Sequence, residues 1–126
     1  MSVFLQGLES GKGRLHRLPS ADEPVDFAHD SERRIAELFD FYGIAWEYEP
    51  TTFVLDTAPD GSLVSAFTPD FYLPDHDLFV EVTTMRQTLV TSKNKKVRRL
   101  RELRPDIQVR VLYRSDLERM FAKHAA

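Results

Sequence analysis

Apolar residues recur at helical spacing between positions 30 and 43. The apolar set is Ile35, Leu38, Phe39 and Tyr42. This spacing of three and four predicts an amphipathic helix, with Asp30 or Ser31 as its N-cap and Gly43 just past its C-terminus. Glu32 lies in the first turn on the same flank as Ile35. Its carboxylate is therefore predicted to point inward, although the helix dipole alone also favours an acid there.

Alternating apolar and polar residues predict the strands. They cover residues 44–49, 52–55, 63–67, 78–83 and 107–113. Residues 56–61 contain turn-forming proline, aspartate and glycine, and connect the second strand to the third. In the fourth strand, Glu81 and Thr83 lie on one face, and Val80 and Val82 lie on the other.

A strongly basic helix is predicted between the last two strands. It begins with Ser92 as N-cap and ends before Pro105. Its basic residues are Lys93, Lys95, Lys96, Arg98, Arg99, Arg101 and Arg104. Lys93 and Lys96 share a flank with Leu100 of the apolar seam, so both lysines are predicted to lean towards the sheet. The side chains predicted to face away are Lys95, Arg98 and Arg99.

A capping-box sequence at residues 115–118 predicts a last helix. The predicted order is helix, four strands, helix, strand and helix. This order is typical of an α/β domain with a mixed central sheet flanked by helices. With 126 residues, the chain is expected to form a single domain over residues 30–126, preceded by an N-terminal arm at residues 1–29.

Composition removes several classes of protein. The absence of cysteine excludes disulfide frameworks and thiolate metal sites, and it suits a reducing cytoplasm. No apolar run approaches the roughly 18 residues that a membrane span needs. Residues 1–8 are too short for a signal peptide and lack its basic flank. We therefore expect a cytoplasmic protein that has no membrane partner.

The net charge of −3 hides two oppositely charged halves. Residues 1–85 carry 5 Lys/Arg against 16 Asp/Glu, a net charge of −11, and residues 86–126 carry 12 against 4, a net charge of +8. Two solvated faces would explain this asymmetry, and so would a metal site beside a surface that binds a polyanion.

The N-terminal arm also has two interpretations, because its basic residues could contact nucleic acid or could pack over the domain or an oligomer partner. They are Lys12, Arg14 and Arg17.

Two carboxylates occupy positions where a charge is costly. Asp70 follows Pro69 at the edge of a turn, ten residues separate it from Glu81, and Glu81 lies inside an apolar strand. A buried carboxylate needs compensation, and a divalent metal is the usual one. Phosphodiester hydrolysis uses such a metal to orient a water, lower its pKa and neutralise phosphate charge. A nearby ammonium usually completes that stabilisation.

These residues resemble the PD-(D/E)XK nuclease superfamily, over residues 30–113. The motif residues are Pro69, Asp70, Glu81, Val82 and Thr83, after a helix that carries Glu32. The resemblance implies a restriction-endonuclease-like core of order αβββαβ. It implies that Asp70, Glu81 and the Val82 carbonyl hold Mg²⁺ or Mn²⁺, with Glu32 as an additional acid. It also implies a phosphodiester hydrolase, with DNA favoured over RNA.

One position departs from the family pattern. The family places a lysine two residues after the strand acid, where this chain has Thr83, and a hydroxyl cannot replace an ammonium. The lysine could have moved to the following helix, as Lys93 or Lys96. Alternatively, the site is inactive and the protein is a nucleic-acid-binding or accessory module on the same fold. A third interpretation is a protein-interaction subunit whose basic helix meets an acidic partner.

An active nuclease would hold the DNA backbone through basic side chains. The candidates are Lys95, Arg98, Arg99 and Arg101 of the helix, and Lys12, Arg14 and Arg17 of the arm. Few residues remain to read bases, which predicts structure-specific rather than sequence-specific recognition. One site cuts one strand, so cleavage of a duplex would need a homodimer or a nicking role.

Two other sites are disfavoured by the residues themselves. Residues 55–62 faintly resemble a phosphoribosyl-pyrophosphate loop, but Pro59 interrupts them and the adjacent acidic pair is missing. A zinc site is disfavoured because the histidines lack the spacing of zinc ligands. They are His16, His29, His76 and His124.

Overall fold

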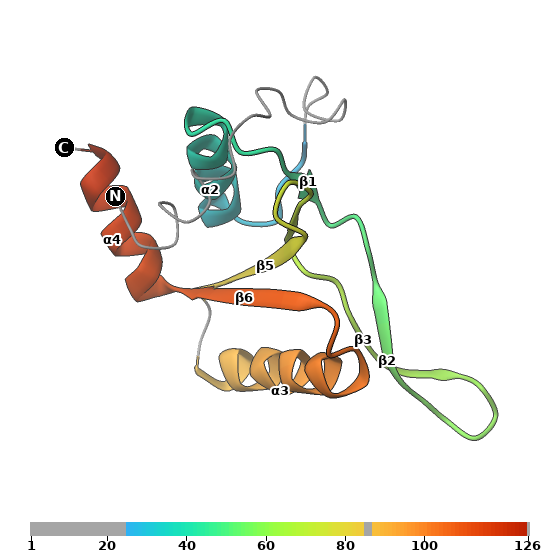
Figure 1. The fold of residues 1–126 in the computed structure, drawn as a ribbon. Helices are drawn as coiled ribbons and strands as arrows, with labels where there is room; N and C mark the ends of the chain where they lie inside the picture. Colours follow the sequence, from blue (N-terminus) through green and yellow to red (C-terminus); the bar gives the residue numbers. More distant parts are fainter. Residues whose placement is uncertain (1–24, 85–86, 126) are drawn as a thin grey trace.

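The computed structural model describes residues 25–84 and 87–125 (Figure 1). Most of the arm, including its three basic residues, lies outside the described residues. The elements are α2 (Asp30–Phe41), β1 (Glu47–Tyr48), β2 (Phe53–Thr57), β3 (Leu63–Phe67), β4 (Phe71–Leu73), β5 (Leu78–Thr83), α3 (Gln87–Leu103), β6 (Gln108–Tyr113) and α4 (Arg114–Ala125). The predicted α/β class with a mixed sheet is confirmed.

The central sheet has four strands in the order β1-β4-β5-β6. β4 is antiparallel to both β1 and β5, whereas β6 is parallel to β5. Helix α3 makes the crossover that a parallel pair of strands requires. The register of this pair places Glu81 of β5 beside Val111 of β6. β2 and β3 form a separate antiparallel hairpin.

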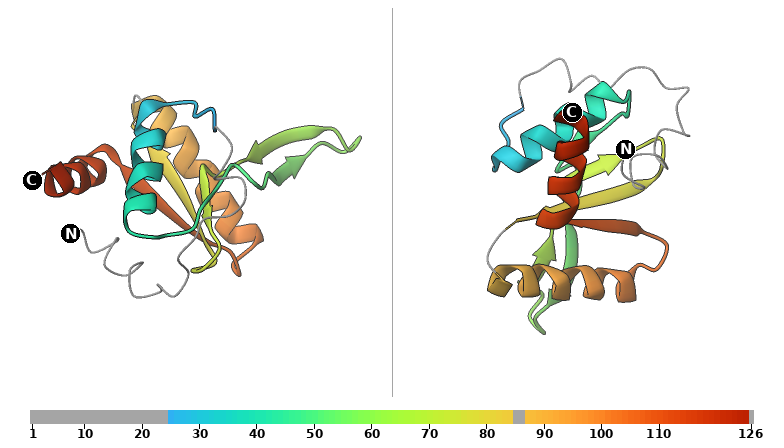
Figure 2. Two further views of the ribbon diagram at one scale, coloured as in Figure 1. Left: turned by 90° about the horizontal axis from the view of Figure 1, so that it is seen from above. Right: turned by 90° about the vertical axis from the view of Figure 1, so that its left-hand side faces the viewer.

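Helices lie on both faces of the sheet (Figures 1 and 2), and an apolar cluster packs on each face. On one face, α2 and α4 pack against Val80 and Val82 of β5. On the other face, α3 and the hairpin pack against Phe79. Because β5 is buried on both faces, the acidic Glu81 in its middle has little access to water.

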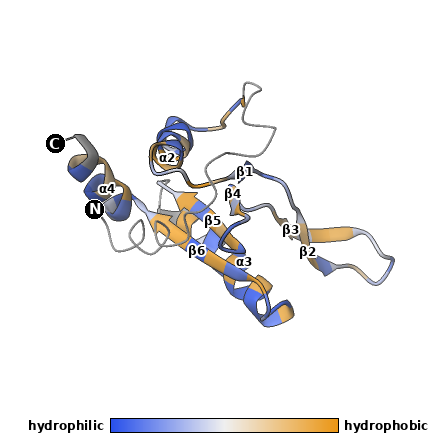
Figure 3. Ribbon diagram, turned by 45° about the horizontal axis from the view of Figure 1, so that its top comes forward, coloured by the Kyte–Doolittle hydropathy of each residue, from blue (hydrophilic) through white to orange (hydrophobic). Residues whose placement is uncertain are grey.

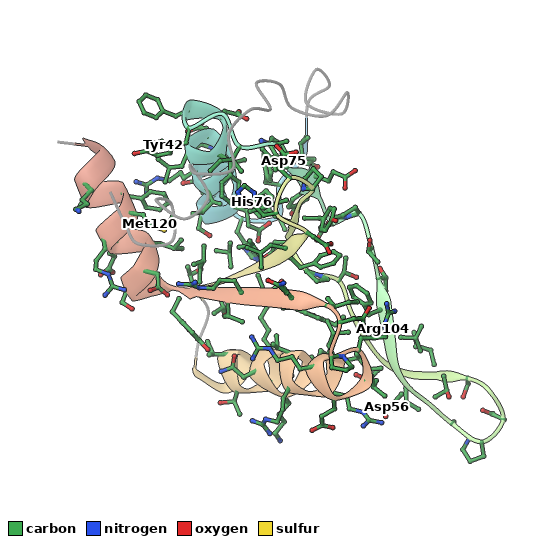
Figure 4. The ribbon with its side chains drawn as sticks, viewed as in Figure 1. Tyr42, Asp56, Asp75, His76, Arg104 and Met120 are labelled. Atoms are coloured by element: carbon green, nitrogen blue, oxygen red, sulfur yellow. The ribbon has the colours of Figure 1, made fainter. Side chains whose placement is uncertain are left out.

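The β2–β3 hairpin projects from the body of the molecule (Figure 2). Its base packs through Leu55 and Phe67 against α3. Asp56 of β2, labelled in Figure 4, forms an ion pair with Arg99 of α3 at 3.0 Å. Val64, on the outer part of the hairpin, is 65% exposed. Figure 3 shows hydrophobic residues along part of the projecting hairpin.

Helix α3 begins at Gln87 and not at Ser92 as predicted. Thr91 and Ser92 are exposed on the helix surface, so the helix continues through the position that was predicted as its N-cap. Val90 is half-buried seven positions before buried Val97, so the apolar seam continues towards the N-terminus.

The caps of the other two helices also differ from the predictions. His29 is the N-cap of α2 and makes no side-chain cap hydrogen bond. Helix α4 begins at Arg114 and not at the capping box from Ser115. Asp116 Oδ2 accepts the Tyr113 N–H at 2.8 Å, so the carboxylate caps the helix from the third helical position.

The strands around Asp70 differ in length from the predictions. β1 covers only Glu47–Tyr48, because its partner β4 is itself three residues long. β4 was not predicted, since three residues are too few to show an alternation. Ile44, predicted to lie in a strand, instead donates its N–H to the Phe39 carbonyl at the end of α2 at 2.8 Å.

None of the helices in the described ranges is long and apolar enough to cross a membrane.

Candidate active site

Strand pairing brings Asp70 and Glu81 together. Asp70 lies just before β4, and because Phe71 pairs with Val80 of β5, Asp70 stands opposite Glu81. The Asp70 N–H donates to Glu81 Oε1 at 3.1 Å, and the Val82 N–H donates to Asp70 Oδ2 at 2.7 Å. Backbone amides therefore fix both carboxylates, each of which is less than a tenth exposed.

Lys93 reaches this pair from α3. Its Nζ lies 2.5 Å from Glu81 Oε2 and donates to the Val82 carbonyl oxygen at 3.3 Å. Lys93 was one of two lysines predicted to lean towards the sheet. The other, Lys96, forms no ion pair with Asp70 or Glu81 in the described part of the chain. The structure thus brings an ammonium to the carboxylate pair from the helix and not from the strand.

Glu32 is the third buried acid near the pair. It is 2% exposed, and Tyr48 Oη donates a hydrogen bond of 2.6 Å to Glu32 Oε1. Tyr48 Oη in turn accepts the Ala28 N–H at 3.0 Å. Burial, together with the hydrogen bond to Glu32, raises the pKa of Tyr48, so the phenol stays protonated and keeps donating to the carboxylate.

Burial raises the pKa of Asp70 to about 8, and the charges of Glu81 and Glu32 push it in the same direction. The Val82 N–H and the Lys93 ammonium oppose this rise. Burial also raises the pKa of Glu81, against the lowering effect of Lys93. Among the described residues, the ammonium of Lys93 pairs with Glu81 and lowers the pKa of Asp70. These two buried carboxylates together with Glu32 carry more negative charge than that one ammonium neutralises.

The donor set suits a hard divalent cation. The carboxylates of Asp70 and Glu81 and the carbonyl of Val82 are oxygen donors of the kind that Mg²⁺ and Mn²⁺ bind, and each carboxylate oxygen keeps a free lone pair beside the hydrogen bond it accepts. In residues 25–84 and 87–125 there is no group of three or more His, Cys, Asp or Glu that could hold a metal ion. A cation here would therefore depend on water or phosphate for its remaining ligands, as Mg²⁺ typically does.

Lys95 and Arg98 of α3 are exposed, and the outer side of this helix is polar (Figure 3). The other two predicted nucleic-acid contacts on α3 have protein partners. Arg99 pairs with Asp56, and Arg101 donates to the Val109 carbonyl at 2.7 Å. Lys12, Arg14 and Arg17 lie outside the described residues. On α3, Lys95 and Arg98 therefore remain the best candidates for contact with an external anion.

Nothing in the sequence singles out Tyr48 as a site residue, because Tyr48 occupies one apolar position of an alternating strand. Its hydroxyl was the available signal, since a buried phenol usually finds a hydrogen-bond partner. Thr83 was noticed only as a missing lysine. It is 2% exposed, and its Oγ1 has no hydrogen-bond partner within the described part of the chain.

A cavity of about 370 Å³ lies elsewhere on the molecule and has an aromatic wall formed by Phe53, Tyr72 and Phe79. Arg104, at the end of α3, also lines it (Figure 4). Asp70 and Glu81 are not among its lining residues, so we do not assign the cavity to the candidate site.

Comparison with known proteins found no significant match to this chain among family models, curated proteins or solved structures.

Proposed function

We propose that this protein is a divalent-metal-dependent nuclease that hydrolyses phosphodiester bonds of DNA. One observation carries the proposal. The buried Glu81 carboxylate accepts the Asp70 N–H, the buried Asp70 carboxylate accepts the Val82 N–H, and a lysine ammonium lies 2.5 Å from the glutamate. Burying this many charges costs stability, which favours a chemical role for them over a structural one.

Each residue has a distinct role in the proposal. Asp70, Glu81 and the Val82 carbonyl hold Mg²⁺ or Mn²⁺. The bound cation supplies a water of lowered pKa and neutralises charge on the phosphate. Lys93 presents its ammonium to the phosphate oxygens, where negative charge develops. Glu32 adds negative charge near Asp70, and its orientation is held by Tyr48.

We also propose that the sheet and its helices form a restriction-endonuclease-like core. The sequence of α2, the antiparallel strands ending in β5, crossover helix α3 and parallel strand β6 supports a restriction-endonuclease-like core. Asp70 lies just before β4 and Glu81 lies within β5, which agrees with the implied PD-(D/E)XK motif. The ammonium comes from Lys93, which offers an explanation for Thr83 at the usual lysine position.

A cleavage assay tests the proposal. We expect the protein to cut linear duplex, single-stranded or branched DNA in Mg²⁺ or Mn²⁺ and to leave it intact in EDTA. Asp70→Ala and Glu81→Ala should each lower the rate by at least about 100-fold. Asp26→Ala, at an exposed position, is the matched control. Cutting that persists in EDTA, or that survives both site variants, would refute a metal-dependent nuclease.

Thr83 favours one alternative, a catalytically inactive DNA-binding or accessory module. A hydroxyl cannot supply the charge of an ammonium, so the alternative holds if Lys93 cannot serve from its helix. The same assay decides between the two. A wild-type protein that shifts DNA at low salt and leaves every substrate intact would be a binding module.

We also expect α3 to contact the DNA backbone. Lys95→Ala and Arg98→Ala should each weaken binding about equally for all sequences, and each should reduce the slope of log K against log salt by about 1. Arg119→Ala is the control, because it removes one positive charge from α4, which packs on the other face of the sheet. The measurement is fluorescence anisotropy of a labelled duplex over a salt series in EDTA. If the salt slope of the Lys95/Arg98 double variant equals that of the wild type, these two side chains of α3 do not contact the DNA backbone.

A further inference from the structure

Thr83 carries a buried hydroxyl that the described residues do not satisfy. It is 2% exposed and its Oγ1 has no hydrogen-bond partner among the described residues. A buried hydroxyl without a partner destabilises the folded state. Valine has nearly the same shape and an equal preference for strands, so packing and strand formation do not require a hydroxyl here.

The unsatisfied hydroxyl belongs to the carboxylate site by its position. Strand alternation puts Thr83 on the same face of β5 as Glu81, the face against which α3 packs. The polar groups around it already have partners. Lys93 Nζ contacts Glu81 and the Val82 carbonyl, and Asn94 Oδ1 accepts from the hydroxyl of Tyr113, the residue opposite Thr83 on β6.

We propose that Thr83 is a positioning residue whose hydroxyl hydrogen-bonds an oxygen atom that arrives with the cation and substrate. This inference rests on the proposed nuclease function. The oxygen belongs either to a water ligand of the cation or to the phosphate of the DNA. Both offer the same chemistry, a lone pair for the Thr83 O–H. Lys93 would then supply the positive charge at the site, and Thr83 would donate a directed hydrogen bond from a neutral hydroxyl.

The first test is thermal unfolding of Thr83→Val and Thr83→Ser, in EDTA and in Mn²⁺. In EDTA, Thr83→Val should raise the Tm by a few degrees, because it removes an unsatisfied polar group. Thr83→Ser keeps the hydroxyl, so its Mn²⁺-induced rise in Tm should match that of the wild type. Thr57→Val, an exposed position on β2, is the control for replacing threonine with valine in a strand.

The second test separates the two sources of the oxygen. Titration calorimetry measures Mn²⁺ alone, and then thymidine 5′-monophosphate in the presence of Mg²⁺. If the partner is a water ligand, Thr83→Val should weaken Mn²⁺ binding by about 3- to 10-fold. If it is a phosphate oxygen, Mn²⁺ binding should stay constant and nucleotide binding should fall by that factor. Either result supports the inference.

Two outcomes would overturn it, and they are distinguishable. If Thr83→Val leaves both affinities unchanged, the hydroxyl bonds neither ligand, whatever the change in Tm, and the nuclease proposal stands without it. If the wild type itself binds neither Mn²⁺ nor the nucleotide, the proposed function fails and this inference fails with it.

Discussion

Replacing Lys93 with methionine is expected to lower metal-dependent DNA cleavage by about 100- to 1,000-fold, whereas Lys96→Met should leave the rate near that of the wild type. Both lysines lie on the same helix and both variants lose one positive charge. Only Lys93 contacts the site, through Glu81 Oε2 at 2.5 Å and the Val82 carbonyl at 3.3 Å. The comparison therefore separates an ammonium at the reacting phosphate from the general basicity of α3.

The same variant should bind Mn²⁺ at least as tightly as the wild type. In the metal-free protein the Lys93 ammonium contacts Glu81 and the Val82 carbonyl, two of the three groups that we assign to the cation. Two positive charges this close repel each other in a partly buried site, so removing one should favour cation binding. Calorimetric titration with Mn²⁺ measures this, and Lys93→Arg, which keeps the charge, is the matched control.

The opposite pattern would change the assignment. If Lys96→Met abolished cleavage and Lys93→Met did not, the ammonium would come from Lys96 during the reaction. If Lys93→Met lost cleavage and Mn²⁺ binding together, its role would be to support the carboxylates. Circular dichroism must accompany each assay, because Lys93→Met leaves the buried Glu81 carboxylate without its ion-pair partner.

The sequence located the acids because each one breaks a strong pattern. Glu81 interrupts an apolar strand, and Glu32 shares the inward flank of a helix with Ile35. Both positions follow from periodicity alone, and both side chains are 2% exposed. Apart from β4, the order of elements from α2 to β6 was also readable, because each longer element repeats its pattern over several turns or alternations.

Choosing between Lys93 and Lys96 required the three-dimensional structure. Residues three apart on a helix share a face, so periodicity cannot tell which one lies level with Glu81. That depends on where α3 begins and how it crosses β5, and its start at Gln87 was itself missed. Tyr48 and β4 were missed for a related reason, since contacts made by very short strands leave little pattern in the sequence.

Replacing Asp70 with asparagine is expected to stabilise the metal-free protein while removing its stabilisation by metal. In the metal-free protein, burial and the charge of Glu81 raise the pKa of Asp70 to about 8, from 3.8 for an ordinary aspartate. The folded state therefore holds a proton that the unfolded chain releases, so the stability contributed by this group falls as the pH rises from about 4 to 8. Asparagine carries no charge at any of these pH values, and its amide oxygen can still accept the Val82 N–H.

The expected signature is a reversal in the order of stability. In EDTA, the free energy of unfolding of Asp70→Asn minus that of the wild type should rise between pH 4 and pH 8, reaching roughly 1–3 kcal/mol. In Mn²⁺ at 100 times its Kd, the wild type should gain about 2.7 kcal/mol and the variant almost nothing. Urea unfolding of both proteins, with Asp26→Asn as an exposed control, measures each arm. A variant that is less stable in EDTA at every pH would mean that the Asp70 carboxylate supports the fold. If the variant is more stable in EDTA and the wild type is more stable in Mn²⁺, the Asp70 carboxylate destabilises the metal-free protein and serves to bind a cation.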